Sequence, residues 1–389
     1  MIVNGIDKLP GLVGKAAKVF MVVDSSYPFL NIKDAIEALQ VEKVMFSGFT
    51  PNPLYEQVCD GIDLFRASGC DTIVAVGGGS AIDVAKCIKL AVLAKEGPSA
   101  LIPPLVSQRL PIDGSRIPFI AIPTTAGTGS ESTHNAVMYY QGAKQTVTND
   151  GVLPDFALLE PSVLKTLPLY QKKSTMMDAL CQGIESWWSV NSTPESKEYS
   201  RKAVELIMGA WRQYIFDNDS QAAAQIMLAA NYGGRAINIA QTTAPHAMSY
   251  KITSMYGLPH GHAVAVCLPE VWQYMLDNPS ECADPRGREY LNGIFGEIAR
   301  ALCPGSVFGP FLTPGSEKQL PGSSFGPILT PGPIERFREM MAELELGRPN
   351  AANGDIDTLT ASVNPVRLKN NPVALSEHAI RKIYGHILG

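Results

Sequence analysis

The stretch DTIVAVGGGSAIDVAK, residues 71–86, decides the fold class of this chain. An apolar run typical of a β-strand enters Gly77, Gly78, Gly79 and Ser80, and a helical pattern follows them directly. This arrangement places backbone N–H groups and the positive end of a helix dipole at one point, where a pyrophosphate can bind. Because glycine-rich turns between strands and helices are common and GGGS is not GxGxxG, the stretch alone does not distinguish a nucleotide site from a structural turn.

Further apolar runs around this stretch extend the pattern. They span residues 18–24, 43–49, 71–78 and 118–125. Amphipathic segments such as 54–69 separate them, and this alternation predicts a parallel sheet covered by helices. Long helical patterns replace the strand runs after about residue 160. We therefore predict an α/β Rossmann-like domain over residues 1–160 and an all-α domain over residues 161–389.

The composition limits the classes of protein to consider. At 389 residues, with 46% hydrophobic and 18% charged residues, the chain can bury a large core. The net charge is −5 and there is no run of Lys and Arg, so we expect no nucleic-acid partner. The N-terminus has no secretory pattern and no stretch reaches the roughly 18 to 20 apolar residues of a membrane span, which predicts a cytoplasmic protein that does not enter the membrane. Seven cysteines without a CxxC pair favour free thiols.

A short internal repeat interrupts the helical half. PGSVFGPFLTPG (304–315) recurs as PGSSFGPILTPG (321–332). Its Pro and Gly content is incompatible with a regular helix or an interior strand, and two copies are too few for a solenoid. The repeat predicts an enlarged surface loop over residues 304–332, with a lid or a subunit contact as the alternatives.

A second loop strengthens the case for a dinucleotide. IPTTAGTGSE, residues 122–131, follows another apolar strand and offers hydroxyl groups and close backbone approach at the same edge of the predicted sheet. Asp24 ends the first strand run, where a carboxylate can accept a hydrogen bond from an adenosine ribose. A carboxylate there favours NAD over NADP. The alternative for Asp24 is a residue that merely starts a turn.

Four residues in the second half have the types and spacing of a divalent-metal site. Asp178 and Gln182 are four apart, so they share one face of a helix. His246 and His260 bound the segment PHAMSYKITSMYGLPH and bring two imidazoles to it. A histidine is expected where Gln182 stands, because imidazole binds first-row divalent metals better than an amide oxygen does. The set suits Fe²⁺, Zn²⁺ or Mn²⁺.

The motifs, in their order and spacing, resemble those of the iron-dependent (group III) alcohol dehydrogenases. They are PNP (51–53), GGGSAIDVAK (77–86), IPTTAGTGSE (122–131), PDFALLEPSVLKTLP (154–168), DALCQGIE (178–185) and LPHGHAVAVCLP (258–269). The similarity covers nearly the whole chain and includes NNPVALSEHAIRKIY near its end. It implies a Rossmann-like domain followed by a helical metal domain, as in the dehydroquinate synthase-like fold. It also implies hydride transfer between NAD(P)H and a carbonyl polarised by the ion, with Fe²⁺ favoured, and a homodimer.

The resemblance assigns roles to individual residues. With Asp24, the expected cofactor contacts are Asn52, Gly77, Gly78, Gly79, Ser80, Asp83, Thr124, Thr125, Thr128 and Lys144. The implied metal ligands are Asp178, His246 and His260, and Gln182 replaces a fourth ligand that is a histidine in most members. A glutamine oxygen can still bind such an ion, so we predict a weaker site.

Two further departures from the family concern the substrate. Tyr250 stands where a second histidine follows His246 by four, and Gln241-Thr242-Thr243 replace small apolar residues. Polar groups beside the metal favour a substrate with polar or anionic oxygens. The candidate substrate residues are Arg235, Thr242, Thr243, Ser249 and Lys251, of which Arg235 and Lys251 could pair with an anion.

Within the family, residues 176–200 and 241–269 are most similar to the phosphonoacetaldehyde reductase branch. That similarity implies reduction of phosphonoacetaldehyde to 2-hydroxyethylphosphonate, with His262 or Tyr250 as a proton relay. His262 could instead orient His260. Three alternatives stay open: a general dehydrogenase of short alcohols and aldehydes of the lactaldehyde or propanediol type, a metal-dependent cyclase or lyase that recycles NAD, and a non-catalytic binding protein.

Overall fold

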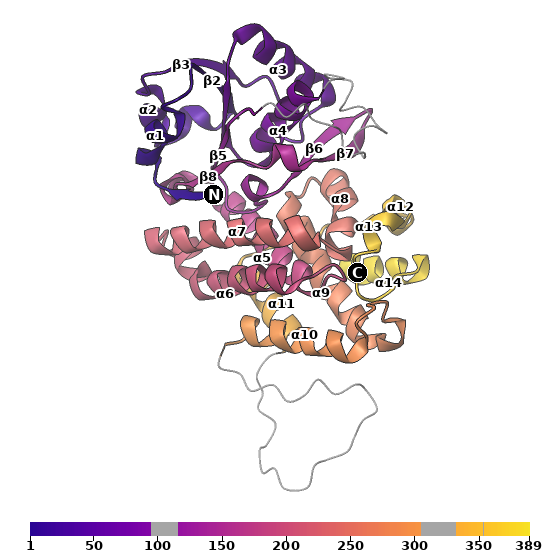
Figure 1. Cartoon of the computed structure of the whole chain (residues 1–389). Coiled ribbons are helices and arrows are strands. Elements are labelled where there is room, and N and C mark those ends of the chain that lie inside the picture. Colours follow the sequence, from indigo (N-terminus) through magenta and orange to yellow (C-terminus); the bar gives the residue numbers. More distant parts are fainter. Residues whose placement is uncertain (95–115, 305–331, 353) are drawn as a thin grey trace. The chain divides into compact units, whose positions relative to one another are not determined.

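The computed structural model describes residues 1–94, 116–304, 332–352 and 354–389 (Figure 1). The predicted loop at 304–332 lies outside these residues except for its two ends. The chain divides into two compact units, which are described separately. The first contains residues 1–172 and 210–238, and the second contains residues 173–209 and 239–389.

A six-stranded parallel sheet forms the centre of the first unit, and it confirms the four predicted strands. In spatial order the strands are β1 (Ile2–Asn4), β8 (Phe156–Leu159), β5 (Phe119–Pro123), β4 (Thr72–Gly77), β2 (Lys18–Val23) and β3 (Glu42–Phe46). Strands β2, β4 and β5 are buried apolar runs, as a sheet covered on both faces requires. The chain passes from β2 to β3 on one side and returns to β4 on the other. The switch point, where such sheets bind ligands beyond their carboxyl ends, is therefore between β2 and β4.

Helices and one hairpin complete this unit. The helices are α1 (Leu9–Val13), α2 (Lys33–Glu37), α3 (Tyr55–Ser68) and α4 (Gly79–Leu93). Helix α4 packs against β2, β4 and β5, and its central position explains why most of its residues are buried. The antiparallel hairpin of β6 (Asn135–Tyr140) and β7 (Ala143–Thr148) was not predicted. Short 3₁₀ helices connect elements of both units: η1 (Ile6–Lys8), η2 (Tyr27–Phe29), η5 (Ser130–Ser132), η6 (Asp150–Val152), η7 (Pro161–Thr166) and η8 (Pro279–Glu281).

The rest of the described chain is helical, as predicted. The helices are α5 (Leu169–Trp188), α6 (Pro194–Phe216), α7 (Ser220–Ala240), α8 (Ala244–Tyr256), α9 (His260–Asp277), α10 (Arg288–Leu302), α11 (Pro333–Glu343), α12 (Asp355–Ser362), α13 (Pro365–Leu368) and α14 (Glu377–Leu388). In the second unit Trp188, Trp272 and Phe295 join α5, α9 and α10 through edge-to-face and tilted ring contacts. No helix in the described residues is long and apolar enough to cross a membrane. All seven cysteines are free thiols.

The boundary between the units differs from the predicted single division at residue 160. Most of α7 belongs to the first unit because it packs on the loop that follows β5. Gly129, at φ +61°, lies so close to Gly234 of α7 that a Cβ on it would come 2.5 Å from the Gly234 Cα. The Asn231 amide donates to Glu131 at 3.0 Å beside this contact. The helical region is therefore divided between the two units.

Candidate functional site

One face of α5 provides the base of the predicted metal site. Asp178, Gln182 and Glu185 are spaced four and three residues apart, so all three project from the same side of the helix. Asp178 and Gln182 are each 3% exposed and Glu185 is fully buried. Buried carboxylates require partners that compensate for the loss of water, and the neighbouring helices supply them.

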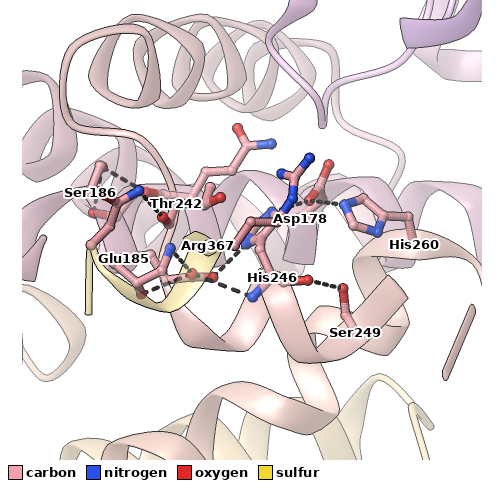
Figure 2. Close-up of polar contacts among 12 residues, drawn as sticks. Asp178, Glu185, Ser186, Thr242, His246, Ser249, His260 and Arg367 are labelled. Carbon is pink, nitrogen blue, oxygen red and sulfur yellow. Dashed lines mark hydrogen bonds and ion pairs between the residues drawn. The ribbon is translucent and has the colours of Figure 1, made fainter. Parts of the chain in front are cut away.

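Helices α8 and α9 each bring one histidine to this face. Gly261 allows the start of α9 to lie against α5, because a Cβ at this position would overlap the Ser174 carbonyl oxygen and come 2.8 Å from the Asp178 Cβ. The Nε2 atoms of His246 and His260 lie 3.3 Å and 3.9 Å from the same Asp178 oxygen. Figure 2 shows the two imidazoles converging on Asp178.

Glu185 fixes the orientation of His246, a role that the sequence analysis missed. One Glu185 oxygen lies 2.5 Å from Nδ1 of His246, and the other accepts from the Thr243 backbone N–H at 2.7 Å and its hydroxyl at 3.0 Å. Burial lowers the pKa of His246, but the carboxylates of Glu185 and Asp178 outweigh it and raise the pKa to about 10. Because Glu185 lies seven residues after Asp178 in the motif DALCQGIE, its helical spacing was a usable signal.

The loop between α7 and α8 uses its polar groups internally. The Thr243 side chain is buried, and its hydroxyl donates to Glu185 and accepts from the Trp188 indole at 2.8 Å. Ser249 is also buried and bonds to the backbone oxygen of His246 at 2.8 Å. Of the hydroxyl residues predicted to contact a substrate, Thr243 and Ser249 therefore hydrogen-bond to Glu185 and His246 of the site itself. Thr242 is half-buried, and its carbonyl accepts from Asn370 at 3.2 Å.

Tyr250 joins the site through His260. Its ring stacks on the His260 imidazole with centroids 5.7 Å apart and an interplanar angle of 11°. On α8 it lies one turn after His246, which explains why it shares that face. The Arg367 guanidinium contacts the Tyr250 ring at 5.2 Å and donates to its hydroxyl at 3.3 Å. Arg367 was not predicted, and nothing in its local sequence indicates this position.

Two other predicted residues project from other sides of α8 and α9, and a third belongs to the first unit. His262 is two residues after His260, so it projects from the opposite side of α9, and its Nε2 lies 2.7 Å from the Gly347 carbonyl oxygen. Lys251 is five residues after His246 and lies about 140° from it around α8. Arg235 belongs to the first unit, where its Nε donates to Asn231 at 3.1 Å.

In the first unit the structure brings the predicted cofactor loops together at the switch point. One Asp24 oxygen accepts from the Gly78 backbone N–H at 2.9 Å. A Cβ at Gly77 would overlap this carboxylate and come 2.7 Å from the Ala81 Cβ, so glycine is required there. The Ser80 hydroxyl accepts from the backbone N–H of Asn52 at 3.3 Å. Gly78 and Gly79 lie at the start of α4, which directs its first N–H groups to this point.

The loop after β5 lies against the same turn. Thr124 donates its backbone N–H to Gly77 at 3.0 Å, and a Cβ on Gly78 would lie 3.5 Å from the Thr125 hydroxyl. A Cβ on Gly79 would lie 2.9 Å from the Thr128 methyl group. The threonines and glycines therefore form one continuous surface.

Asp83 supports this surface from inside the unit. Its oxygens accept from the Ser130 hydroxyl at 2.6 Å and from the Val137 backbone N–H at 3.0 Å. Burial raises the pKa of Asp83, opposed by the charges of Lys86 and Lys144. Lys86 is itself buried and donates to Ser130 at 2.9 Å, and burial lowers its pKa to about 8.

The donor atoms on α5, α8 and α9 fit a divalent metal ion. One oxygen of Asp178 and one nitrogen from each of His246 and His260 lie within 4.8 Å of one another. Two imidazoles and a carboxylate suit first-row divalent metals, and Glu185 supplies the carboxylate that typically orients a metal-binding histidine. The buried Gln182 lies one turn along α5 from Asp178 and could add an amide oxygen.

A nucleotide-type sheet and a His–Asp donor cluster are together typical of enzymes that combine a dinucleotide with a divalent metal ion, and comparison with known proteins identifies the family. Residues 3–161 match the family described as iron-containing alcohol dehydrogenase, and residues 172–302 match its C-terminal part. The chain belongs to the iron-containing alcohol dehydrogenase family. This confirms the resemblance and the predicted fold class.

Individual relatives show the range of activities in this family. The chain is 36% identical to phosphonoacetaldehyde reductase of Streptomyces viridochromogenes over 76% of each chain. It is 33% identical to 1,3-propanediol dehydrogenase of Klebsiella pneumoniae over 63% of each. Among solved structures, sulfoacetaldehyde reductase from Bifidobacterium kashiwanohense in complex with NAD⁺ has a TM-score of 0.79 at 23% identity, covering 100% of this chain and 96% of that one. A 1,3-propanediol oxidoreductase has a TM-score of 0.82 at 23% identity, covering 100% and 98%.

Proposed function

We propose that this protein reduces a short anionic aldehyde to a primary alcohol with NAD(P)H, and that the aldehyde is phosphonoacetaldehyde. The observation that carries the proposal is the convergence of Asp178, His246 and His260 on one point. The similarity to a phosphonoacetaldehyde reductase supports the choice of substrate. The product would be 2-hydroxyethylphosphonate.

The reaction adds one hydride to the carbonyl carbon and one proton to its oxygen. When bound, a divalent ion supplies Lewis-acid polarisation of the carbonyl, and NAD(P)H supplies the hydride. Asp178, His246 and His260 would hold the ion, with Gln182 as a possible fourth ligand. Glu185 holds the His246 ring so that Nε2 faces Asp178. Of the two residues predicted to relay a proton, Tyr250 lies beside the candidate ligand His260, because its ring stacks on that imidazole.

The first unit would bind the dinucleotide. The pyrophosphate would lie against the first N–H groups of α4, where glycines leave room for it. Asp24 accepts from the Gly78 N–H of this turn, and it would also accept from a ribose hydroxyl, which favours NADH over a 2′-phosphorylated cofactor.

A panel of aldehydes tests this function. Metal-stripped protein would be reconstituted with Fe²⁺, Zn²⁺ or Mn²⁺ and assayed with NADH and NADPH against phosphonoacetaldehyde, propanal and lactaldehyde. We expect net NADH oxidation and the highest kcat/KM for phosphonoacetaldehyde. Equal kcat/KM values for all three aldehydes would exclude the proposed substrate class. Product formation without net NADH consumption would instead indicate a cyclase or lyase.

A general short-chain alcohol dehydrogenase is the second candidate. The similarity to 1,3-propanediol dehydrogenase favours it. Such an enzyme would share the metal and cofactor residues but would need no group that binds an acid. Oxidation of 1,3-propanediol at a kcat/KM above that for 2-hydroxyethylphosphonate would favour this candidate.

A further inference from the structure

The proposed substrate sets a strict condition on the residue that binds its acid group. In phosphonoacetaldehyde a single methylene separates the phosphonate from the carbonyl carbon. The cation that binds the phosphonate must therefore lie at the edge of the metal site itself. Of the predicted cations, Lys251 projects from another side of α8 than His246, and Arg235 donates to Asn231 at 3.1 Å within the first unit.

Arg367 is connected to the candidate metal ligands through two successive ring contacts. Its guanidinium lies 5.2 Å from the centre of the Tyr250 ring, and that ring lies 5.7 Å from the ring of the metal-ligand candidate His260. Figure 2 shows the Arg367 side chain extending towards Asp178 and His246. The side chain is half-buried, so the guanidinium is partly removed from water without being enclosed.

The segment that carries Arg367 is fixed at both ends of the short helix α13. Asn364 caps the start of α13 by accepting from the Val366 backbone N–H at 2.9 Å. Just beyond its end, the Asn370 amide donates to the Gln241 side chain at 2.8 Å and to the Thr242 carbonyl at 3.2 Å. The carbonyl of Asn370 also accepts from the Val190 backbone N–H at 3.1 Å. The bonds of the Asn370 amide join the end of α13 to the loop that leads into α8, and its carbonyl joins it to the segment that follows α5.

We propose that Arg367 is the specificity-determining residue that binds the acid group of the substrate. The inference rests on the proposed function and names a residue for it. A guanidinium carries five N–H donors in a planar fork, so it can hold the Tyr250 hydroxyl and an oxyacid together. Tyr250 positions Arg367 by its ring and hydroxyl, which gives a physical reason for a tyrosine at the place where the family resemblance implies a histidine.

Substitution of Arg367 tests the inference directly. Arg367→Met keeps much of the side-chain volume without the charge, and Arg367→Lys keeps the charge without the planar fork. Lys369→Met is the matched control, because Lys369 is an exposed cation at the C-cap of the same short helix. Each metal-reconstituted variant would be assayed for kcat/KM with phosphonoacetaldehyde, sulfoacetaldehyde and uncharged propanal.

We expect Arg367→Met to lower kcat/KM for both anionic aldehydes roughly 100-fold and to leave the value for propanal within about threefold. Arg367→Lys should recover part of the loss, since an ammonium group binds an oxyacid as a point charge. Lys369→Met should match the wild type with all three aldehydes.

The outcomes separate this inference from the proposed function. If wild-type protein shows no preference for anionic aldehydes, the proposed function fails. If the wild type shows the preference and Arg367→Met keeps it, or loses activity equally with propanal, Arg367 is not the acid-binding residue while the proposed function stands. Should Arg367→Met not fold, inhibition by ethylphosphonate provides the second measurement. An Arg367→Lys inhibition constant equal to that of the wild type would also overturn the inference.

Discussion

Replacing Glu185 with glutamine should weaken the metal site while leaving its shape unchanged. In the wild type one Glu185 oxygen accepts from the backbone N–H and hydroxyl of Thr243, at 2.7 Å and 3.0 Å, and the other faces Nδ1 of His246 at 2.5 Å. The Thr243 N–H is a fixed donor, so the single amide oxygen of glutamine must remain with it. The amide NH₂ then faces Nδ1 of His246.

That reversal changes the tautomer of the histidine. An NH₂ group opposite Nδ1 requires Nδ1 to accept, so the one proton that His246 keeps in its neutral, metal-binding form would lie on Nε2 and not on Nδ1. Nε2 is the atom that faces Asp178 at 3.3 Å and that must be unprotonated to bind a metal. Loss of an orienting carboxylate of this kind typically costs about 10- to 100-fold in metal affinity. We expect Glu185→Gln to fall in that range because Glu185 is fully buried and water cannot substitute for it.

The measurement is a dissociation constant for Zn²⁺ and Co²⁺, obtained by competition with a chelating dye on metal-stripped protein. The melting temperature of the stripped protein shows whether the variant folds. Glu297→Gln is the control, since Glu297 is an exposed carboxylate that accepts from the Trp187 indole and contacts no histidine in the described chain. A folded Glu185→Gln variant that binds Zn²⁺ within about twofold of the wild type would refute the tautomer argument.

Three further predictions concern the metal and its surroundings. Gln182→His should tighten Zn²⁺ binding about tenfold or more, because imidazole is a better ligand than an amide oxygen, and an unchanged dissociation constant would place residue 182 outside the ligand set. Metal affinity should rise about tenfold per pH unit between pH 6 and 9. The pKa of His246 is raised to about 10, so this histidine must release a proton when the metal binds. A metal affinity that does not change with pH in calorimetry would contradict this. Gly261→Ala should destabilise the protein by about 3 kcal/mol, because the added methyl group overlaps the Ser174 carbonyl oxygen. At Gly293 an added methyl group meets no atom within 4 Å, so Gly293→Ala should be neutral or stabilising. Thermal melts of both variants measure the difference.

The sheet and the long helices could be predicted because their signals are local. Each buried strand is an apolar run in the sequence, and helix α7 (Ser220–Ala240) lies in the region of long helical patterns after residue 160. The β6–β7 hairpin was missed although a signal was present. Its turn consists of Gln141 and Gly142, both at positive φ, between two runs with β-branched and aromatic residues. The division of the units could not be predicted, because it depends on the approach of Gly129 to Gly234 across more than a hundred residues.

The candidate metal site was predictable to the extent that helical spacing and residue type define it. Asp178 and Gln182 are one turn apart, and the same spacing rule applied once more would have found Glu185. The structure also changes the roles expected of neighbouring residues. Thr243 and Ser249 were predicted to contact a substrate from their proximity in sequence to His246, yet their hydroxyls bond within the site's own framework. Proximity along a helix does not specify which side chains face the substrate, because neighbours point in different directions.

The position of Tyr250 shows why the substrate side needed the tertiary structure. From sequence, Tyr250 is only a departure from the histidine that the family resemblance implies. In the structure it contacts a guanidinium 117 residues away along the chain, and the same ring stacks on His260. A histidine ring could stack there too, but it offers no phenolic hydroxyl to receive Arg367. The change at residue 250 and the arginine at residue 367 therefore have one physical explanation: together they hold a positive charge beside the ligands that would bind the carbonyl-polarising ion. Under the proposed function that charge would bind the acid group of the aldehyde, whereas an uncharged alcohol has no group for it to bind.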